Sequence, residues 1–172
     1  MLIRAVSHAT RKEYALDLGC GAGRDTRYLL EQGFDVTAVD SDPNAMTILA
    51  TFPHQERLHT VQSSFADFTF GNYDLINAHF ALPFAGKRRF AEVFDRVKRA
   101  LRPGGIFAGQ FFGVHDEWNV PGQDITFVTR EQAEEMLHGF ALIEFNEEDM
   151  DGHTADGAPK HWHVFNILAR KL

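Results

Sequence analysis

Cysteine and basic residues are scarce in this sequence, and both shortages narrow what the protein can do. The only cysteine is Cys20, which excludes a disulfide framework and a metal site built on several cysteines. Lys and Arg number 17 against 24 Asp and Glu, so the formal net charge is −7. This balance argues against a nucleic-acid partner. We therefore expect a small-molecule ligand and a reducing compartment, with the cytoplasm as the default location.

Long hydrophobic runs are also missing. The N-terminal stretch Met1 to His8 has too few consecutive apolar residues for a signal peptide or a membrane span, so no membrane association is predicted. Hydrophobic residues make up 44% of 172 residues, enough for one substantial core but not for two ordinary enzyme domains. Residues 1–172 are therefore predicted to form one domain, in which 1–13 is a short N-terminal extension that could be mobile.

The most informative segment joins a predicted strand at 14–18 to a helix through three glycines, Gly19, Gly21 and Gly23. Glycines let a backbone approach its ligand closely, and the start of the following helix offers free N–H groups and the positive end of its dipole. Asp40 follows the next apolar run. Its separation from the glycines along the sequence is about that at which nucleotide-binding units place an acidic residue to bind a ribose. This segment predicts a nucleotide-type cofactor site.

The spacing of these glycines discriminates between nucleotide ligands. Dinucleotide sites favour G-x-G-x-x-G, whereas here the glycines occupy alternate positions and Arg24 follows them. Asp17, two residues before the first glycine, would repel a pyrophosphate but could accept a hydrogen bond from an ammonium group. The run resembles the D-x-G-x-G-x-G motif of class I S-adenosylmethionine-dependent methyltransferases. This resemblance implies S-adenosyl-L-methionine as the cofactor and S-adenosyl-L-homocysteine as the product.

Helical and strand patterns alternate along the chain. They predict strands at about 14–18, 36–39, 57–62, 73–78, 106–112, 141–148 and 162–169, and helices at about 24–32, 43–49, 87–101 and 130–137. Such alternation favours an α/β, Rossmann-like, doubly wound sheet of about seven strands, mostly parallel with an antiparallel C-terminal hairpin. Pro103 should end the fourth helix, and the turn at 101–105 is similar to the one before strand five in these methyltransferases. Many relatives carry one or two further helices before the first strand, which help to close the cofactor site. Only about a dozen residues precede that strand here, so the lid is expected to be short or supplied by another part of the structure.

The resemblance also implies which residues hold the cofactor, because open α/β sheets bind ligands at the carboxyl ends of their strands. Asp40 would accept hydrogen bonds from the ribose hydroxyls, and Asp67 from the adenine amino group. The alternatives are a helix-terminal charge for Asp40 and an ordinary turn aspartate for Asp67. The predicted cofactor-binding residues are Asp17, Gly19, Cys20, Gly21, Gly23, Arg24, Asp40, Ser41, Phe65, Ala66, Asp67, Phe68, Asn77 and Ala78.

Two histidines are candidates for a general base or for residues of the acceptor pocket. Methyl transfer depends mainly on alignment and on exclusion of water, and a base helps only where the acceptor carries a proton. His79 follows the fourth predicted strand, and His161 lies in the segment K-H-W-H-V-F at 160–165. That segment resembles a subgroup of small bacterial methyltransferases that includes tellurite-resistance-type relatives. A purely structural role is the alternative for each.

Aromatic residues beyond the fifth strand suggest a wall for the acceptor. Phe111, Phe112, His115 and Trp118 could form it with Phe84, although core packing explains the first two equally well. His161 and His163 share one strand face and could ligate a metal with His153 or Asp149. Histidine pairs at strand spacing are commonly structural, so no metal is predicted.

The sequence therefore favours an S-adenosylmethionine-dependent methyltransferase acting on a small-molecule acceptor by in-line displacement, and it leaves the acceptor and the oligomeric state open. Two other functions compete. One is a catalytically idle S-adenosylmethionine-binding or partner-activating module, suggested by the short N-terminal segment. The other is an NAD-dependent oxidoreductase, which Asp17 and Arg24 disfavour.

Overall fold

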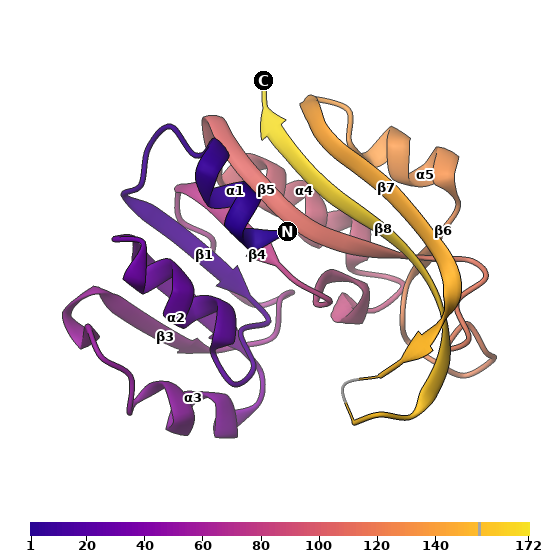
Figure 1. The fold of residues 1–172 in the computed structure, drawn as a ribbon, viewed down its shortest axis with the longest axis horizontal. Coiled ribbons are helices and arrows are strands. Elements are labelled where there is room, and N and C mark those ends of the chain that lie inside the picture. The colour runs from indigo at the N-terminus through magenta and orange to yellow at the C-terminus, as the bar shows by residue number, and fades with distance from the viewer. Residues whose placement is uncertain (155) are drawn as a thin grey trace.

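The computed structural model describes residues 1–154 and 156–172 and contains one sheet in the order β3-β2-β1-β4-β5-β8-β7, with β6 beside β5 (Figure 1). Strands β1 to β5 run parallel, whereas β8 is antiparallel to both β5 and β7. The predicted parallel sheet with an antiparallel C-terminal hairpin is thus confirmed. The strands are β1 (Tyr14–Leu18), β2 (Asp35–Asp40), β3 (Leu58–Gln62), β4 (Tyr73–Ala78), β5 (Leu101–Gly113), β6 (Phe127–Val128), β7 (Phe140–His153) and β8 (Pro159–Lys171).

Helices cover both faces of the sheet. The elements are α1 (Leu2–His8), α2 (Arg24–Glu31), α3 (Pro43–Leu49), α4 (Phe90–Ala100), α5 (Arg130–Met136) and the 3₁₀ turns η1 (Gln55–Arg57) and η2 (Leu82–Ala85). Successive strand residues point to opposite faces, so Ala15 packs in the cluster with α1, α2 and α3, and Leu16 packs in the cluster with α4 and α5. Figure 1 shows α1 and α2 over the near face. No helix in the described part of the chain is both long and apolar enough to cross a membrane.

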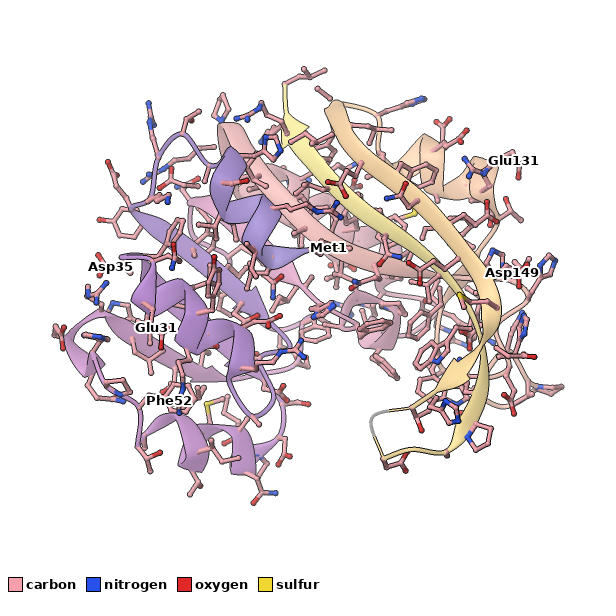
Figure 2. The ribbon with its side chains drawn as sticks, in the orientation of Figure 1. Met1, Glu31, Asp35, Phe52, Glu131 and Asp149 are labelled. Atoms are coloured by element: carbon pink, nitrogen blue, oxygen red, sulfur yellow. The ribbon has the colours of Figure 1, made fainter. Side chains whose placement is uncertain are left out.

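The N-terminal segment contains a helix that the sequence analysis did not predict. This helix, α1, buries Leu2, Ala5 and Val6 in the core. Met1 packs against the same cluster and lies over the sheet (Figure 2). Three apolar residues on one face of two helical turns supply the burial that a short helix needs to be stable in a protein.

The boundaries of three strands also differ from the prediction. Strand β5 begins at Leu101, before the Pro-Gly-Gly turn, and its pairing with β4 shifts register between Tyr73 and Leu75 to absorb these residues. Strands β7 and β8 extend to His153 and Pro159, well past the predicted ends, because polar residues of the expected loop pair across the hairpin. The long hairpin projects beyond the rest of the sheet at the edge where β1, β2 and β4 end (Figure 1).

Candidate functional site

The glycine turn after β1 is held against the end of β2. The N–H of Gly19 donates to Val39 O at 2.8 Å, and the N–H of Gly21 donates to Asp40 Oδ2 at 2.8 Å. Gly19 has a φ of 80°, and a Cβ at this position would lie 2.5 Å from the Cβ of Ala81. Only glycine therefore allows this close backbone approach. The glycine turn is therefore held to β2 by two acceptors, the Val39 carbonyl and the Asp40 carboxylate.

A cavity of about 290 Å³ opens beside this turn. It is lined by Gly19, by the polar residues Asp40 and Ser41, and by apolar residues that include Phe65 and Ala66. The second oxygen of Asp40 accepts from the N–H of Asp42 at 3.0 Å, so the carboxylate is fixed at the cavity wall. A carboxylate beside apolar and aromatic side chains suits a nucleoside.

A second cavity of about 220 Å³ shares Gly19 with the first. Asp17, Cys20, Arg24 and His79 are among the residues that line it. Acidic, basic and imidazole groups therefore face one small space, which suits a zwitterionic ligand such as an amino acid.

Asp17 is buried, and its carboxylate accepts hydrogen bonds from Thr26 Oγ1 at 2.6 Å and from Asn77 Nδ2 at 2.9 Å. Burial raises the pKa of Asp17 to about 6, although these two hydrogen bonds oppose the shift. Cys20 is likewise buried, which raises the pKa of its thiol to about 12 with help from the charges of Asp17 and Asp40. The thiol therefore stays protonated and is not a nucleophile.

His79, Asp25 and Arg24 form a polar cluster at the start of α2. The His79 Nδ1 lies 3.2 Å from Asp25 Oδ2 and 2.9 Å from Arg24 Nη2. Partial burial raises the pKa of Asp25, but hydrogen bonds from His79 and Arg24 outweigh this and hold it well below its usual range. Asp25 is thus a stable anion beside an imidazole. The sequence analysis assigned it no role, although its place at the start of the helix after the glycine turn was a signal.

A third and larger cavity, about 650 Å³, lies between the sheet edge and the hairpin. Phe80, Phe84, Phe112, Trp118 and Trp162 supply its aromatic walls. It shares Phe80 and Phe84 with the first cavity. It also shares Arg24 and His79 with the second. All three cavities therefore meet at the end of β4.

Phe80 is positioned at this junction by unusual backbone geometry. It has a φ of 50°, in the left-handed region that a bulky residue rarely adopts, and its N–H donates to Gln110 Oε1 at 2.9 Å. Gln110 is buried in β5. Non-glycine residues in this region are held by their surroundings and cluster at functional sites.

Six predicted cofactor residues do not line these cavities, and two of them, Gly21 and Gly23, belong to the glycine turn itself. Asn77 and Ala78 are buried, and the Asn77 amide donates to Asp17 and Asp25, so it orients other site residues. Asp67 is exposed and accepts from Ser64 Oγ at 2.6 Å, as its turn interpretation requires. The prediction that Phe68 contacts the cofactor is corrected, because its side chain is buried in the core on the α4 face and cannot contact a ligand.

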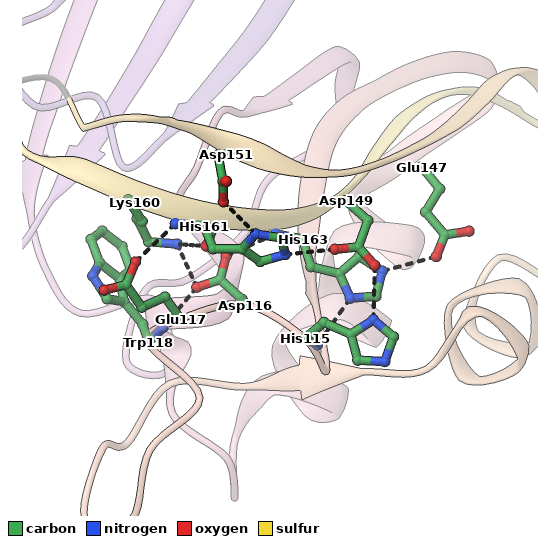
Figure 3. Close-up of polar contacts among 10 residues, drawn as sticks. All are labelled: His115, Asp116, Glu117, Trp118, Glu147, Asp149, Asp151, Lys160, His161 and His163. Atoms are coloured by element: carbon green, nitrogen blue, oxygen red, sulfur yellow. Dashed lines mark hydrogen bonds and ion pairs between the residues drawn. The ribbon is translucent and has the colours of Figure 1, made fainter.

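His161, predicted as a base or an acceptor-pocket residue, does not line the aromatic cavity. It lies on the opposite face of the hairpin from that cavity. Its neighbour Trp162 lines that cavity, while His161 Nδ1 bonds Asp151 at 2.8 Å and His161 Nε2 bonds Asp149 at 2.7 Å (Figure 3). Both carboxylates raise the pKa of His161. A histidine with both nitrogens donating has no lone pair left to accept a proton.

His163 shares this outer face, as predicted, and lies near His115 and Asp149. Each of the three offers a possible metal-ligand atom, all within 4.8 Å. However, His163 Nδ1 accepts from the backbone N–H of His115 at 3.0 Å, and its Nε2 lies 2.9 Å from Glu147 (Figure 3). Both nitrogens of His163 therefore have protein partners, and the group is explained as a hydrogen-bonded network.

Comparison with known proteins identifies relatives of both sequence and fold. The profile of the family described as methyltransferase domain matches residues 16–107. The chain is 26% identical, over 162 residues, to a probable S-adenosyl-L-methionine-dependent methyltransferase TehB of Haemophilus influenzae, covering 91% of this chain and 56% of that protein. An uncharacterized methyltransferase of Synechocystis is 35% identical over 95 residues, covering 54% of this chain and 44% of that protein. The chain thus spans about half the length of these curated relatives.

The fold is similar to that of the TehB crystal structure from Haemophilus influenzae, with a TM-score of 0.82 and 23% identity, covering 99% of this chain and 61% of that one. A second similar structure is a 1,6-didemethyltoxoflavin-N1-methyltransferase of Burkholderia thailandensis with bound 1,6-didemethyltoxoflavin and S-adenosylhomocysteine. It has a TM-score of 0.72 and 24% identity, covering 99% of this chain and 77% of that one.

Proposed function

The chain belongs to the methyltransferase domain family, and on this premise we propose that residues 1–172 act as one domain that transfers a methyl group from S-adenosyl-L-methionine to a small molecule. The observation that carries the proposal is the meeting of three cavities at His79 and Phe80. Two cavities match the nucleoside and amino-acid parts of the cofactor, and the third leaves room for an acceptor. A partner-activating module would not need this third space.

The residues of the two smaller cavities fit the cofactor. Asp40 would accept hydrogen bonds from the ribose hydroxyls, and Gly19 leaves the space that a Cβ would fill. Asp17 would face the ammonium group, and Arg24 the carboxylate. When bound, the cofactor supplies a methyl group on a sulfonium and leaves as neutral S-adenosyl-L-homocysteine. The protein's task is then to align the acceptor with that methyl group and to exclude water.

His79 is the proposed general base. A carboxylate can only accept a hydrogen bond and a guanidinium can only donate one, so Nδ1 pairs with Asp25 when it carries a proton and with Arg24 when it does not. With the Arg24 guanidinium on the cofactor carboxylate, the proton on Nδ1 would donate to Asp25 and leave the Nε2 lone pair for the acceptor. His79 lines the aromatic cavity and the amino-acid cavity at once, so a proton released by an acceptor would have a short path to it. Asp25 then stabilises the imidazolium.

The cofactor assignment is tested by calorimetric titration with S-adenosyl-L-methionine, S-adenosyl-L-homocysteine and NADH. We expect the first two to bind, and Asp40→Ala to weaken both by about 5- to 150-fold, because the ribose hydroxyls and the Gly21 N–H lose their acceptor. Asp35→Ala, at the other end of β2 (Figure 2), is the matched control and should bind normally. Tight NADH binding without a response to the other two ligands would contradict the assignment.

Cofactor binding should also release a proton below pH 6. Asp17, with its pKa raised to about 6 by burial, is mostly protonated at pH 5.5 without ligand. An ammonium group in the second cavity stabilises the carboxylate and lowers that pKa, so affinity should rise between about pH 5 and pH 7. Titrations at pH 5.5 in buffers of different ionisation enthalpy should report up to about one proton released.

Two comparisons make this proton count specific to Asp17. At pH 8 its carboxylate is already ionised, so the observed binding enthalpy should be independent of the buffer for this group. The Asp17→Asn variant should lose the proton release at pH 5.5. Wild-type protein that binds the cofactor at pH 5.5 with no buffer dependence would remove Asp17 from the ammonium contact.

A further inference from the structure

The walls of the aromatic cavity indicate which kind of molecule it binds. Building on the proposed function, we propose that the methyl acceptor is a flat aromatic molecule with an acidic O–H or N–H group, which lies between the aromatic side chains with that group directed at His79. This inference narrows the small-molecule acceptor to one chemical class.

The aromatic side chains leave ring surface available in the cavity. Phe80 and Phe84 are 40% and 48% exposed, although both are large apolar residues. Neither ring is stacked on its tryptophan neighbour. The ring centroids of Phe80 and Trp162 are 5.5 Å apart with an interplanar angle of 58°, and those of Phe84 and Trp118 are 6.2 Å apart with an interplanar angle of 62°. A planar guest would cover this exposed surface and gain the offset or edge-to-face contacts that aromatic rings prefer.

The polar groups of the cavity are placed at the end nearest the cofactor site. His79 and Arg24 are shared with the amino-acid cavity. Arg24 Nε is paired with Asp25 Oδ1 at 3.0 Å, but the side chain is 78% exposed, so its Nη groups can reach an oxyanion or a deprotonated ring nitrogen as well as the cofactor carboxylate. An acidic group of the acceptor therefore finds a base and a cation at the position where the methyl group is transferred.

A cationic acceptor fits these walls less well. Lys160 Nζ already lies 3.7 Å from the ring centroid of Trp162 and 4.4 Å from that of Trp118, without lining the cavity. Cation–π attraction from these two rings is therefore directed at the protein's own ammonium group. The two carboxylates of the cavity wall also have partners in the protein: Glu148 accepts from Asn166 at 3.0 Å, and Asp151 Oδ1 lies 2.8 Å from His161 Nδ1.

The proposed step balances without a further reactant. The acceptor oxygen or nitrogen forms a bond to the methyl carbon, and the bond between that carbon and sulfur breaks with its electron pair staying on sulfur. The proton of the acceptor passes to His79 Nε2 and later to solvent. The products are the methylated aromatic molecule and S-adenosyl-L-homocysteine.

Tryptophan fluorescence tests this inference directly, because both tryptophans of the chain, Trp118 and Trp162, line the cavity. The probes are phenol, its saturated counterpart cyclohexanol, and phenyltrimethylammonium, each titrated with and without saturating S-adenosyl-L-homocysteine. Free N-acetyltryptophanamide corrects for absorption by the probes. We expect a saturable change with phenol, and at least tenfold weaker binding of the other two.

Substitutions then locate the binding. Phe84→Ala, an exposed wall residue, should weaken phenol binding by about 2- to 12-fold, the range that corresponds to one lost aromatic pair. Leu142→Ala removes a similarly exposed apolar side chain from β7 outside the cavity and should have no effect.

The outcomes separate this inference from the proposed function. Calorimetric binding of S-adenosyl-L-homocysteine without any response to phenol would overturn the aromatic acceptor and leave the cofactor assignment intact. Tighter binding of cyclohexanol or of the ammonium compound would also overturn it. Saturable phenol binding that Phe84→Ala weakens would support it even if the cofactor failed to bind.

Discussion

Replacing Lys160 with methionine should lower the free energy of unfolding by about 3–5 kcal/mol. Lys160 Nζ lies 2.5 Å from Asp116 Oδ1, and the two side chains are only 1% and 0% exposed. Methionine preserves most of the volume of the lysine stem but leaves the Asp116 carboxylate in the interior without a cation. Urea denaturation, followed by circular dichroism, measures the difference.

Two controls separate the lost charge from other effects of the substitution. Lys12→Met changes an exposed lysine and should alter stability by less than about 0.5 kcal/mol. Adding Asp116→Asn to Lys160→Met removes the unpaired charge, so the double variant should be more stable than the single one. A loss of less than about 1 kcal/mol for Lys160→Met alone would mean that water replaces the ammonium group and that the pair is not sealed from solvent.

The same ion pair explains how the aromatic cavity is held together. Asp116 Oδ1 also accepts from the N–H of Trp118, and its Oδ2 accepts from the N–H of His163 in β8. The pair therefore ties the segment after β5 to the hairpin, with Trp118 on one side of it (Figure 3). The sequence places Lys160 beside His161 in the segment 160–165 but does not reveal Asp116 as its partner, because 44 positions separate the two residues.

The first half of the site could be predicted because its causes are local. Gly19 has a φ of 80°, which favours glycine at the turn, and Asp40 ends the strand whose carbonyl holds that turn. Asp42 caps α3 by accepting from the N–H of Asn44, and Pro43 begins that helix. Each of these features depends on residues within a few positions of one another or on one strand pairing.

The hairpin could not be predicted in the same way. The sequence shows that His161 and His163 share a face, since side chains alternate along a strand. Which face looks into the cavity depends on the pairing of β8 with β5 and β7, which places Trp162 opposite Met150 and His161 opposite Asp151. Periodicity alone leaves both choices open, and a shift of one residue reverses them.

Replacing His79 with asparagine should reduce kcat by about 10²- to 10⁴-fold, the usual contribution of a general base. The asparagine Nδ2 can take the place of the imidazole Nδ1 and still donate to Asp25, while the group that corresponds to Nε2 is gone. Cofactor affinity should therefore change little. Formation of S-adenosyl-L-homocysteine from S-adenosyl-L-methionine measures the rate, with phenol as the first acceptor tested.

The acidity of the acceptor distinguishes a base from a residue that only shapes the pocket. Phenol is neutral at pH 8 and needs a base, whereas 4-nitrophenol is already ionised and does not. The loss caused by His79→Asn should therefore be large for phenol and close to absent for 4-nitrophenol. His59→Asn, on the exposed edge strand β3, should leave both rates unchanged. An equal loss with the two acceptors would assign His79 to positioning, because a geometric defect slows an ionised acceptor as much as a neutral one.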